Sequence, residues 1–286
     1  MNIKKALGVV VGFLAVGSYY LIENPTGNKL LKDVVGVEIS TSVIKDKILN
    51  QEASSPTTGF SDRLGLPDWG EESFYQSKKV LKEMTKRHPE SFYCGCDIKF
   101  VDNTTLVPDF TSCGFEYRKN EERANRMEAE HIVPISWYGQ NLQCWQNGGR
   151  SNCKKVSDIF NKAEGDLVNL QYAIGEVNGD RSNFRYGQWN GGGGQYGSCD
   201  AKVDFSNRRF QPREEIRGHI GRVHLYMKKK YGLMLSDSQD KLIEAWASKP
   251  PTAWECEYDK MLKDKYGSEA GNPYSEYACQ LVEKMR

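Results

Sequence analysis

Apolar residues recur at helical spacing in three stretches of the chain: residues 73–88, 212–233 and 236–247. Proline cannot continue a helix, so we expect the first helix to end before Pro89. The second stretch carries an apolar face that consists of Ile216, Ile220, Val223, Met227 and Tyr231. These patterns predict three helices.

Strand patterns are shorter and lie mainly before residue 132. Residues 97–101 and 115–120 indicate two strands around a polar turn at residues 102–105. The glycine-rich stretch "WNGGGGQYGSC" at 189–199 lacks the G-K-[ST] ending of a phosphate-binding loop, and no clear strand leads into it. We therefore interpret it as a structural loop.

The stretch "EAEHIVPISWYG" at residues 128–139 places Glu130 beside His131 where the chain turns apolar. Adjacent residues of a strand point to opposite faces, so both groups can serve one site only if the strand ends, bends or bulges there. Pro134 argues against an uninterrupted strand.

Two interpretations of this pair are open at this point. In one, Glu130 is solvated while His131 makes a structural hydrogen bond. In the other, the carboxylate binds a hard cation and the neutral imidazole accepts a proton from water, as in a metal-dependent hydrolase. The pair alone does not decide between them.

The N-terminal segment has the pattern of an export signal. Lys4 and Lys5 precede an apolar run, and small residues near Gly17 suit cleavage, so we interpret residues 1–17 as a signal peptide. The alternative is an uncleaved anchor that extends to residue 22. We expect residues 18–70 to form an extension and linker, and residues 71–286 to form one domain.

Eight cysteines lie after residue 90, and this even number behind an export signal predicts disulfides in an oxidising compartment. Cys144 and Cys153 are plausible partners because a short glycine-containing loop separates them. Cys94 and Cys96 are too close to pair easily with each other, so we expect each to reach a distant partner. The remaining connectivity is open. No C-x-x-C pair or zinc-finger histidine spacing is present, which argues against structural zinc.

The overall charge indicates no particular partner, since 39 Lys and Arg against 38 Asp and Glu give a net charge of +1. Residues 150–230, however, contain 15 Lys and Arg against 9 Asp and Glu, which leaves a local positive surplus. His219 and His224 lie five residues apart on the second predicted helix, which does not suit a pair of helical metal ligands. We interpret them as surface or core-edge residues.

Three ordered blocks carry a resemblance to a known family. They are "EAEHIVPISWYGQNLQCWQNGGRSNC" (128–153), "KAEGDLVNLQYAIGEVNGDRSNFRYGQWNGGGGQYGSC" (162–199) and "PTAWECEYDK" (251–260). Together with "YCGC" at 93–96, they closely resemble bacterial endonuclease I, a family of secreted or periplasmic nonspecific nucleases. The likeness runs from about Tyr93 to Gln280.

The resemblance implies an α+β fold with a ββα-metal core, also called a His-Me finger, inside a mostly helical, disulfide-stabilised domain. It implies that His131 is the general base and that Glu130 and Asn178 hold Mg²⁺, for which Mn²⁺ or Ca²⁺ can substitute structurally. Arg150 matches the arginine that contacts the scissile phosphate, and Glu164 matches a glutamate near the active site.

The function implied by this resemblance is hydrolysis of phosphodiester bonds in DNA, and also in RNA, to leave 5′-phosphate ends. We expect a periplasmic or secreted monomer that has no protein partner and contacts phosphates without sequence specificity. Candidates for these contacts are Arg181, Arg185, Arg208 and Arg209.

Two other classes of protein fit parts of the pattern. One is a catalytically inactive envelope protein that binds or takes up DNA, and the intact set of catalytic residues argues against it. The other is a zinc peptidase, which would need a motif such as H-E-x-x-H. The sequence contains no such motif.

Overall fold

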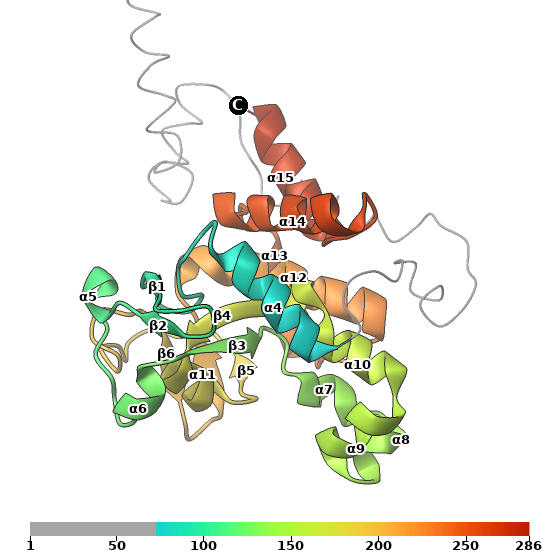
Figure 1. Ribbon diagram of the computed structural model, residues 1–286, viewed down its shortest axis with the longest axis horizontal. Coiled ribbons are helices and arrows are strands. Elements are labelled where there is room, and N and C mark those ends of the chain that lie inside the picture. Colours follow the sequence, from blue (N-terminus) through green and yellow to red (C-terminus); the bar gives the residue numbers. More distant parts are fainter. Residues whose placement is uncertain (1–72, 286) are drawn as a thin grey trace, which may run out of the picture. The chain divides into compact units, whose positions relative to one another are not determined.

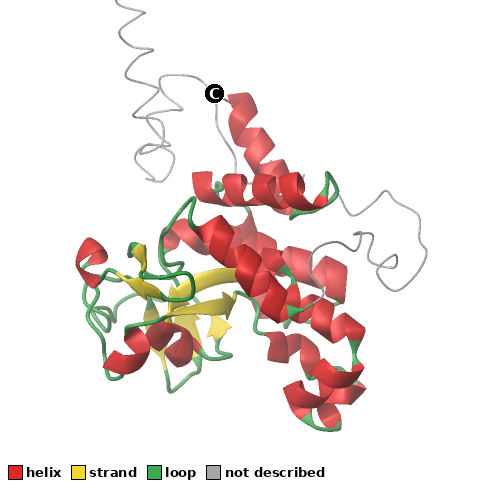
Figure 2. Ribbon diagram, viewed as in Figure 1, coloured by secondary structure: helices red, strands yellow, loops and turns green. Residues whose placement is uncertain are grey.

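The computed structural model describes residues 73–285, which belong to one compact unit. The predicted signal peptide and the whole of the predicted extension and linker lie outside these residues. Helices predominate in the described part, and short strands form three small sheets (Figure 2). Among residues 73–285, no helix is both long and apolar enough to cross a membrane. This mixture of helices and strands confirms the predicted α+β class.

A strand pair and the helix that follows it form the centre of the domain. Strand β3 (Met127–His131) pairs antiparallel with β4 (Leu170–Ile174), and α11 (Gly175–Arg181) begins directly after β4. Helix α4 (Phe74–Thr85) packs against β4, and α11 packs against both strands. With helices packed on it, every residue of β4 is buried.

Strand β3 ends at His131, as the proline nearby had indicated. Beyond it, the backbone N–H of Ile132 donates to the carbonyl of Asn169, and that of Val133 donates to the Asn169 side chain. Pro134 then precedes a new helix. The backbone groups that would have continued the ladder are thus paired with a buried asparagine.

Four short helices lie in the chain between β3 and β4 (Figure 1). They are α7 (Ile135–Gly139), α8 (Gln143–Gln146), α9 (Gly149–Val156) and α10 (Asp158–Gly165), followed by the 3-10 turn η2 (Leu167–Asn169). A helical segment therefore connects the two strands of the central pair, and its last turn, η2, lies beside the end of β3.

The C-terminal part is helical and packs around α12 (Arg217–Tyr231). Helix α12 contacts α13 (Asp237–Ala247) and α15 (Pro273–Met285), and α15 also contacts α14 (Ala253–Tyr266). Gly221 allows the α12–α13 approach, because a Cβ there would overlap the backbone of Ala247.

Burial extends around nearly the whole of α12, which corrects one expectation. The predicted apolar face is buried, but so are His219 and His224, which were expected at the surface or core edge. His224 is 0% exposed, and one of its ring nitrogens bonds to the carbonyl of Ile220. These histidines belong to the core of the domain.

The strand predicted at residues 115–120 is not formed. Strand β1 (Ile98–Phe100) is close to its predicted position, but its antiparallel partner is β2 (Leu106–Pro108), immediately after the polar turn. The backbone N–H groups of residues 118, 119 and 120 donate to the carboxylate of Glu176 on α11 instead. A tertiary contact therefore replaces the strand ladder at that segment.

The remaining elements are short. They are α5 (Phe110–Cys113), α6 (Glu121–Ala124), β5 (Arg185–Tyr186), β6 (Lys202–Asp204), β7 (Arg209–Gln211) and the 3-10 turn η3 (Glu214–Ile216). In the third sheet β7 lies between β5 and β6.

All eight cysteines form disulfides: Cys94–Cys199, Cys96–Cys113, Cys144–Cys153 and Cys256–Cys279. The pairing expected for Cys144 and Cys153 is confirmed, and it joins α8 to α9. Cys94 and Cys96 each reach a partner outside their own turn, as predicted. The disulfides thus crosslink the segments around Cys94 and Cys96, the helices α8 and α9, and the C-terminal helices α14 and α15.

Candidate active site at the end of strand β3

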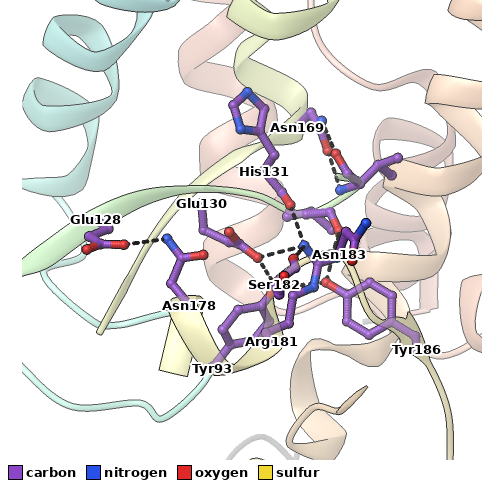
Figure 3. A network of polar contacts seen from close by, with 12 residues as sticks. Tyr93, Glu128, Glu130, His131, Asn169, Asn178, Arg181, Ser182, Asn183 and Tyr186 are labelled. Atoms are coloured by element: carbon purple, nitrogen blue, oxygen red, sulfur yellow. Dashed lines mark hydrogen bonds and ion pairs between the residues drawn. The ribbon is translucent and has the colours of Figure 1, made fainter. Parts of the chain in front are cut away.

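Glu130 occupies a buried, polar position near the end of β3. Its carboxylate oxygen Oε1 accepts hydrogen bonds from the Tyr93 hydroxyl at 2.8 Å and from Arg181 Nη1 at 2.9 Å (Figure 3). The residue is only 4% exposed. Burial raises the pKa of Glu130, while Arg181 and the Tyr93 hydrogen bond act in the opposite direction.

Arg181 supports this site from inside the protein, which corrects its predicted role as a groove residue. It is 1% exposed, so it does not lie on a surface that could contact nucleic acid. Besides Glu130, its guanidinium donates to the carbonyls of His131 at 3.1 Å and Ile132 at 2.5 Å. The guanidinium therefore holds both the carboxylate and the backbone at the end of β3.

The geometry of His131 fixes which ring nitrogen carries the proton. Nε2 lies 2.8 Å from the backbone carbonyl of Glu164, and a carbonyl oxygen can only accept. In the neutral ring Nε2 is therefore the donor, and Nδ1 holds a free lone pair. The ring packs against Phe74, with centroids 4.8 Å apart.

Burial lowers the pKa of His131 from 6.5 to about 4, and the positive charges of Arg150 and Arg181 act in the same direction. The hydrogen bond to Glu164 opposes these effects but does not cancel them. At pH 7 the imidazole is thus neutral, which is the form that can accept a proton.

Glu164 and Arg150 lie next to His131 and bond to each other. The Glu164 carboxylate, which is 1% exposed, accepts from Arg150 Nε at 2.6 Å and lies 3.6 Å from Lys154 Nζ. The side chain of Arg150 is 46% exposed, so its guanidinium is accessible to a ligand. Glu164 thus contacts His131 through its backbone and Arg150 through its side chain.

Asn178 reaches the site from α11. Its amide nitrogen Nδ2 donates to Glu128 Oε2 at 2.9 Å. Figure 3 shows Asn178 between Glu128 and Glu130, with the amide oxygen turned away from Glu128. The structure therefore brings the amide oxygen of Asn178 to the side of the site where Glu130 lies.

This donor set fits a magnesium ion. Within residues 73–285, no cluster of three or more His, Cys, Asp or Glu side chains could hold a metal. Glu130 and Asn178 instead offer one carboxylate and one amide oxygen, and Mg²⁺ commonly uses one or two protein oxygens while keeping several waters.

The other three predicted arginines lie apart from these buried groups. Arg185, Arg208 and Arg209 are exposed, and each guanidinium lies over an aromatic ring, at 5.4 Å, 5.2 Å and 5.1 Å respectively. The first of them follows α11 after only a short loop. All three lie in the segment that follows the candidate site, and Arg209 is also ion-paired with Asp204, at 3.0 Å between Nη2 and Oδ2.

Comparison with known proteins gives a consistent result. The sequence profile of the family described as Endonuclease I matches residues 73–279. The chain belongs to the endonuclease I family. The predicted resemblance is thereby confirmed, and this membership supports the assignment of the protein as a nuclease.

Relatives within the endonuclease I family cover most of the domain. An extracellular deoxyribonuclease of Aeromonas hydrophila is 48% identical over 211 residues, which are 73% of this chain and 90% of that protein. A periplasmic deoxyribonuclease of the same species is 47% identical, over 73% of this chain and 87% of its own length. Endonuclease-1 of Buchnera aphidicola subsp. Acyrthosiphon pisum (strain APS) is 44% identical over 198 residues, 69% of this chain and 78% of its own length.

This member of the endonuclease I family is periplasmic or secreted, as its relatives are named. Its four disulfides agree with that compartment, because such bonds persist in oxidising environments.

Sequence reasoning missed two residues that contact the predicted ligands. Tyr93 bonds to Glu130, but it lies 37 residues away and only the fold reveals the contact. Glu128 bonds to Asn178 and could have been noticed, because residues two apart on a strand share a face. Its acidic side chain therefore points to the same side of β3 as Glu130.

We expect the imidazole of His131 to titrate with a pKa of about 4 in the metal-free endonuclease I protein, because burial disfavours the charged ring. The ring should stay neutral from pH 8 down to about pH 5. Nitrogen-15 NMR of the histidine rings, assigned with a His131→Asn variant, measures this directly. A midpoint near 6.5 would contradict the burial argument.

Proposed function

We propose that this protein is a nonspecific endonuclease that hydrolyses phosphodiester bonds with one Mg²⁺ ion and with His131 as general base. One observation carries the proposal: His131 keeps a free lone pair on Nδ1 because Nε2 is committed to a carbonyl oxygen. Glu130, whose carboxylate can bind a hard cation, directly precedes His131 in the same strand. A base and a hard-cation ligand are thus neighbours in the chain where β3 ends.

The order of strands and helix supports the assignment of a ββα-metal core. An antiparallel pair, β3 and β4, is followed directly by α11, with Glu130 and His131 on the first strand and Asn178 on the helix. This is the arrangement expected of a ββα-metal, or His-Me finger, core. We propose that Glu130 and Asn178 hold the ion, and that Mn²⁺ or Ca²⁺ can occupy the same position.

In the proposed reaction His131 Nδ1 takes a proton from a water molecule as the water oxygen attacks phosphorus. The bond from phosphorus to the 3′-oxygen breaks, which leaves a 5′-phosphate on one fragment, and the departing 3′-oxygen takes a proton from a solvent water to become the 3′-hydroxyl of the other. When bound, Mg²⁺ supplies Lewis-acid stabilisation of the charge that develops on the phosphate and the leaving oxygen.

Arg150 has the position and exposure for a phosphate contact. Its Nε is bonded to the buried carboxylate of Glu164, which fixes the direction of the guanidinium. The remaining N–H groups can donate to phosphate oxygens, for which the planar guanidinium is well suited. Glu164 is proposed to orient both Arg150 and His131 rather than to react itself.

We propose DNA as the substrate because two close relatives are named deoxyribonucleases. RNA presents the same phosphodiester to the same groups, so we also expect cleavage of RNA. Arg185, Arg208 and Arg209 would contact backbone phosphates, which carry no sequence information. We expect the enzyme to act as a monomer without a protein partner.

The other candidate is a catalytically inactive protein of the envelope that binds or takes up DNA. The complete set of groups around His131, each held by hydrogen bonds, disfavours it. A plasmid-nicking assay distinguishes the two functions, because only the enzyme would convert supercoiled plasmid in Mg²⁺ and stop in EDTA.

We predict that His131→Ala lowers the rate of nicking at saturating Mg²⁺ by about 10²- to 10⁴-fold, the usual contribution of a general base. Affinity for DNA should be almost unchanged, because His131 makes no phosphate contact in this proposal. His88→Ala is the matched control, since His88 is a half-exposed histidine that stacks on Trp254 instead. If His131→Ala kept more than half of the activity, His131 would be structural.

We predict that the double variant Arg185→Gln and Arg208→Gln weakens binding and makes it less dependent on salt. Each phosphate contact contributes about 0.9 to the slope of log K against log salt concentration on duplex DNA, so the slope should fall by about 2. Binding is measured by fluorescence anisotropy in the His131→Ala background without Mg²⁺. Lys260→Gln, an exposed charge on α14, is the control and should leave the slope unchanged. An unchanged slope in the double variant would remove both arginines from the substrate surface.

A further inference from the structure

Glu128 lies on the same face of β3 as Glu130, because the two residues are separated by one position on the strand. Whereas the Glu130 carboxylate pairs with Arg181, that of Glu128 accepts an amide hydrogen of Asn178 at 2.9 Å (Figure 3). A second acidic residue of the strand thus faces the helix that carries the other proposed ligand.

The hydrogen-bond chemistry of this contact fixes the orientation of the amide. Asn178 has a donor end and an acceptor end of nearly the same shape, so packing alone does not distinguish them. An ionised carboxylate can only accept, which requires Nδ2 to face Glu128. The oxygen Oδ1 must then point the other way, which is the orientation that a metal ligand needs.

Two arginines hold the Glu128 carboxylate in place. Arg123 donates from Nε to Oε1 at 3.0 Å and from Nη2 to Oε2 at 2.7 Å. Arg126 donates from Nε to Oε1 at 3.0 Å. These positive charges offset the repulsion between Glu128 and Glu130, and the two-point contact with Arg123 restricts rotation of the carboxylate.

The surface of α11 leaves room for this arrangement. Gly175 and Gly179 are four residues apart and therefore lie on one face of the helix. A Cβ at Gly179 would overlap the guanidinium of Arg123, and a Cβ at Gly175 would lie 3.0 Å from Glu128 Oε1. Two glycines on either side of Asn178 thus allow the Arg123–Glu128 pair to lie against the helix.

We propose that Glu128, held by Arg123 and Arg126, is a positioning residue that selects the metal-binding orientation of the Asn178 amide. This inference rests on the proposed function of Asn178 as a Mg²⁺ ligand. Glu128 does not touch the ion in this arrangement. It acts by excluding the flipped amide, whose nitrogen would face the ion.

The test is the affinity for Mg²⁺ in the absence of nucleic acid, measured by isothermal titration calorimetry on the oxidised protein. Glu128→Gln keeps the shape of the side chain but can donate as well as accept, so it permits either orientation of Asn178. We expect the dissociation constant for Mg²⁺ to rise by about tenfold, the lower end of the effect of removing a group that orients a metal ligand.

A swapped pair gives a result that a merely structural role would not. In the double variant Glu128→Gln and Asn178→Asp the donor and the acceptor are exchanged, so the introduced amide on β3 would donate to one oxygen of the new carboxylate and leave the other for the ion. Mg²⁺ affinity should return to at least that of the unsubstituted protein. Asp180→Asn is the matched control, because Asp180 is an arginine-paired carboxylate on α11 that bonds to Arg118 and not to Asn178.

The outcomes separate this inference from the proposed function. If the unsubstituted protein binds no Mg²⁺, the proposed metal site itself is wrong. If it binds Mg²⁺ and Glu128→Gln binds it equally well, only the positioning role is wrong. Weakened binding that the swapped pair does not restore, or an equal loss in Asp180→Asn, would likewise overturn that role.

Discussion

The buried ion pair between Glu130 and Arg181 is the interaction on which the rest of the site depends. A carboxylate with 4% exposure loses most of its hydration, and its charge must be compensated within the protein. Arg181 does this, and it also donates to the carbonyls of His131 and Ile132. One guanidinium therefore holds the carboxylate of one proposed metal ligand and the backbone of the proposed base. Removing it would leave a buried charge without a partner.

The helical segment between β3 and β4 contributes the remaining groups of the candidate site. Helix α10 brings the backbone of Glu164 to His131 and its carboxylate to Arg150. Arg150 itself is near the start of α9, which the Cys144–Cys153 disulfide ties to α8. The groups on the strand are thus fixed by burial and ion pairing, whereas the exposed arginine is fixed by a crosslinked helix and one buried carboxylate. This difference suits their proposed roles, since the arginine must meet a substrate that arrives from solvent.

The residues of this candidate site were easier to find in the sequence than the contacts that surround them. The pair Glu130 and His131 could be found because the two are neighbours in the chain and a proline follows. Arg181 was misplaced because burial of an arginine depends on a carboxylate that folding brings to it, and no local pattern reveals that partner. Residues 115–120 have the composition of a strand, but the N–H groups of residues 118–120 bond to Glu176, which is far away in the chain. Contacts between distant segments therefore account for both errors.

We propose above all that one divalent cation binds between Glu130 and Asn178, near the end of β3 that His131 occupies. Crystals grown with Mn²⁺ would test it through an anomalous difference map collected at the manganese absorption edge. We expect a single strong peak within about 2.0–2.3 Å of a Glu130 carboxylate oxygen and of Asn178 Oδ1, with waters completing an octahedral shell. A map without a peak there, or with its strongest peak at other residues, would contradict the account.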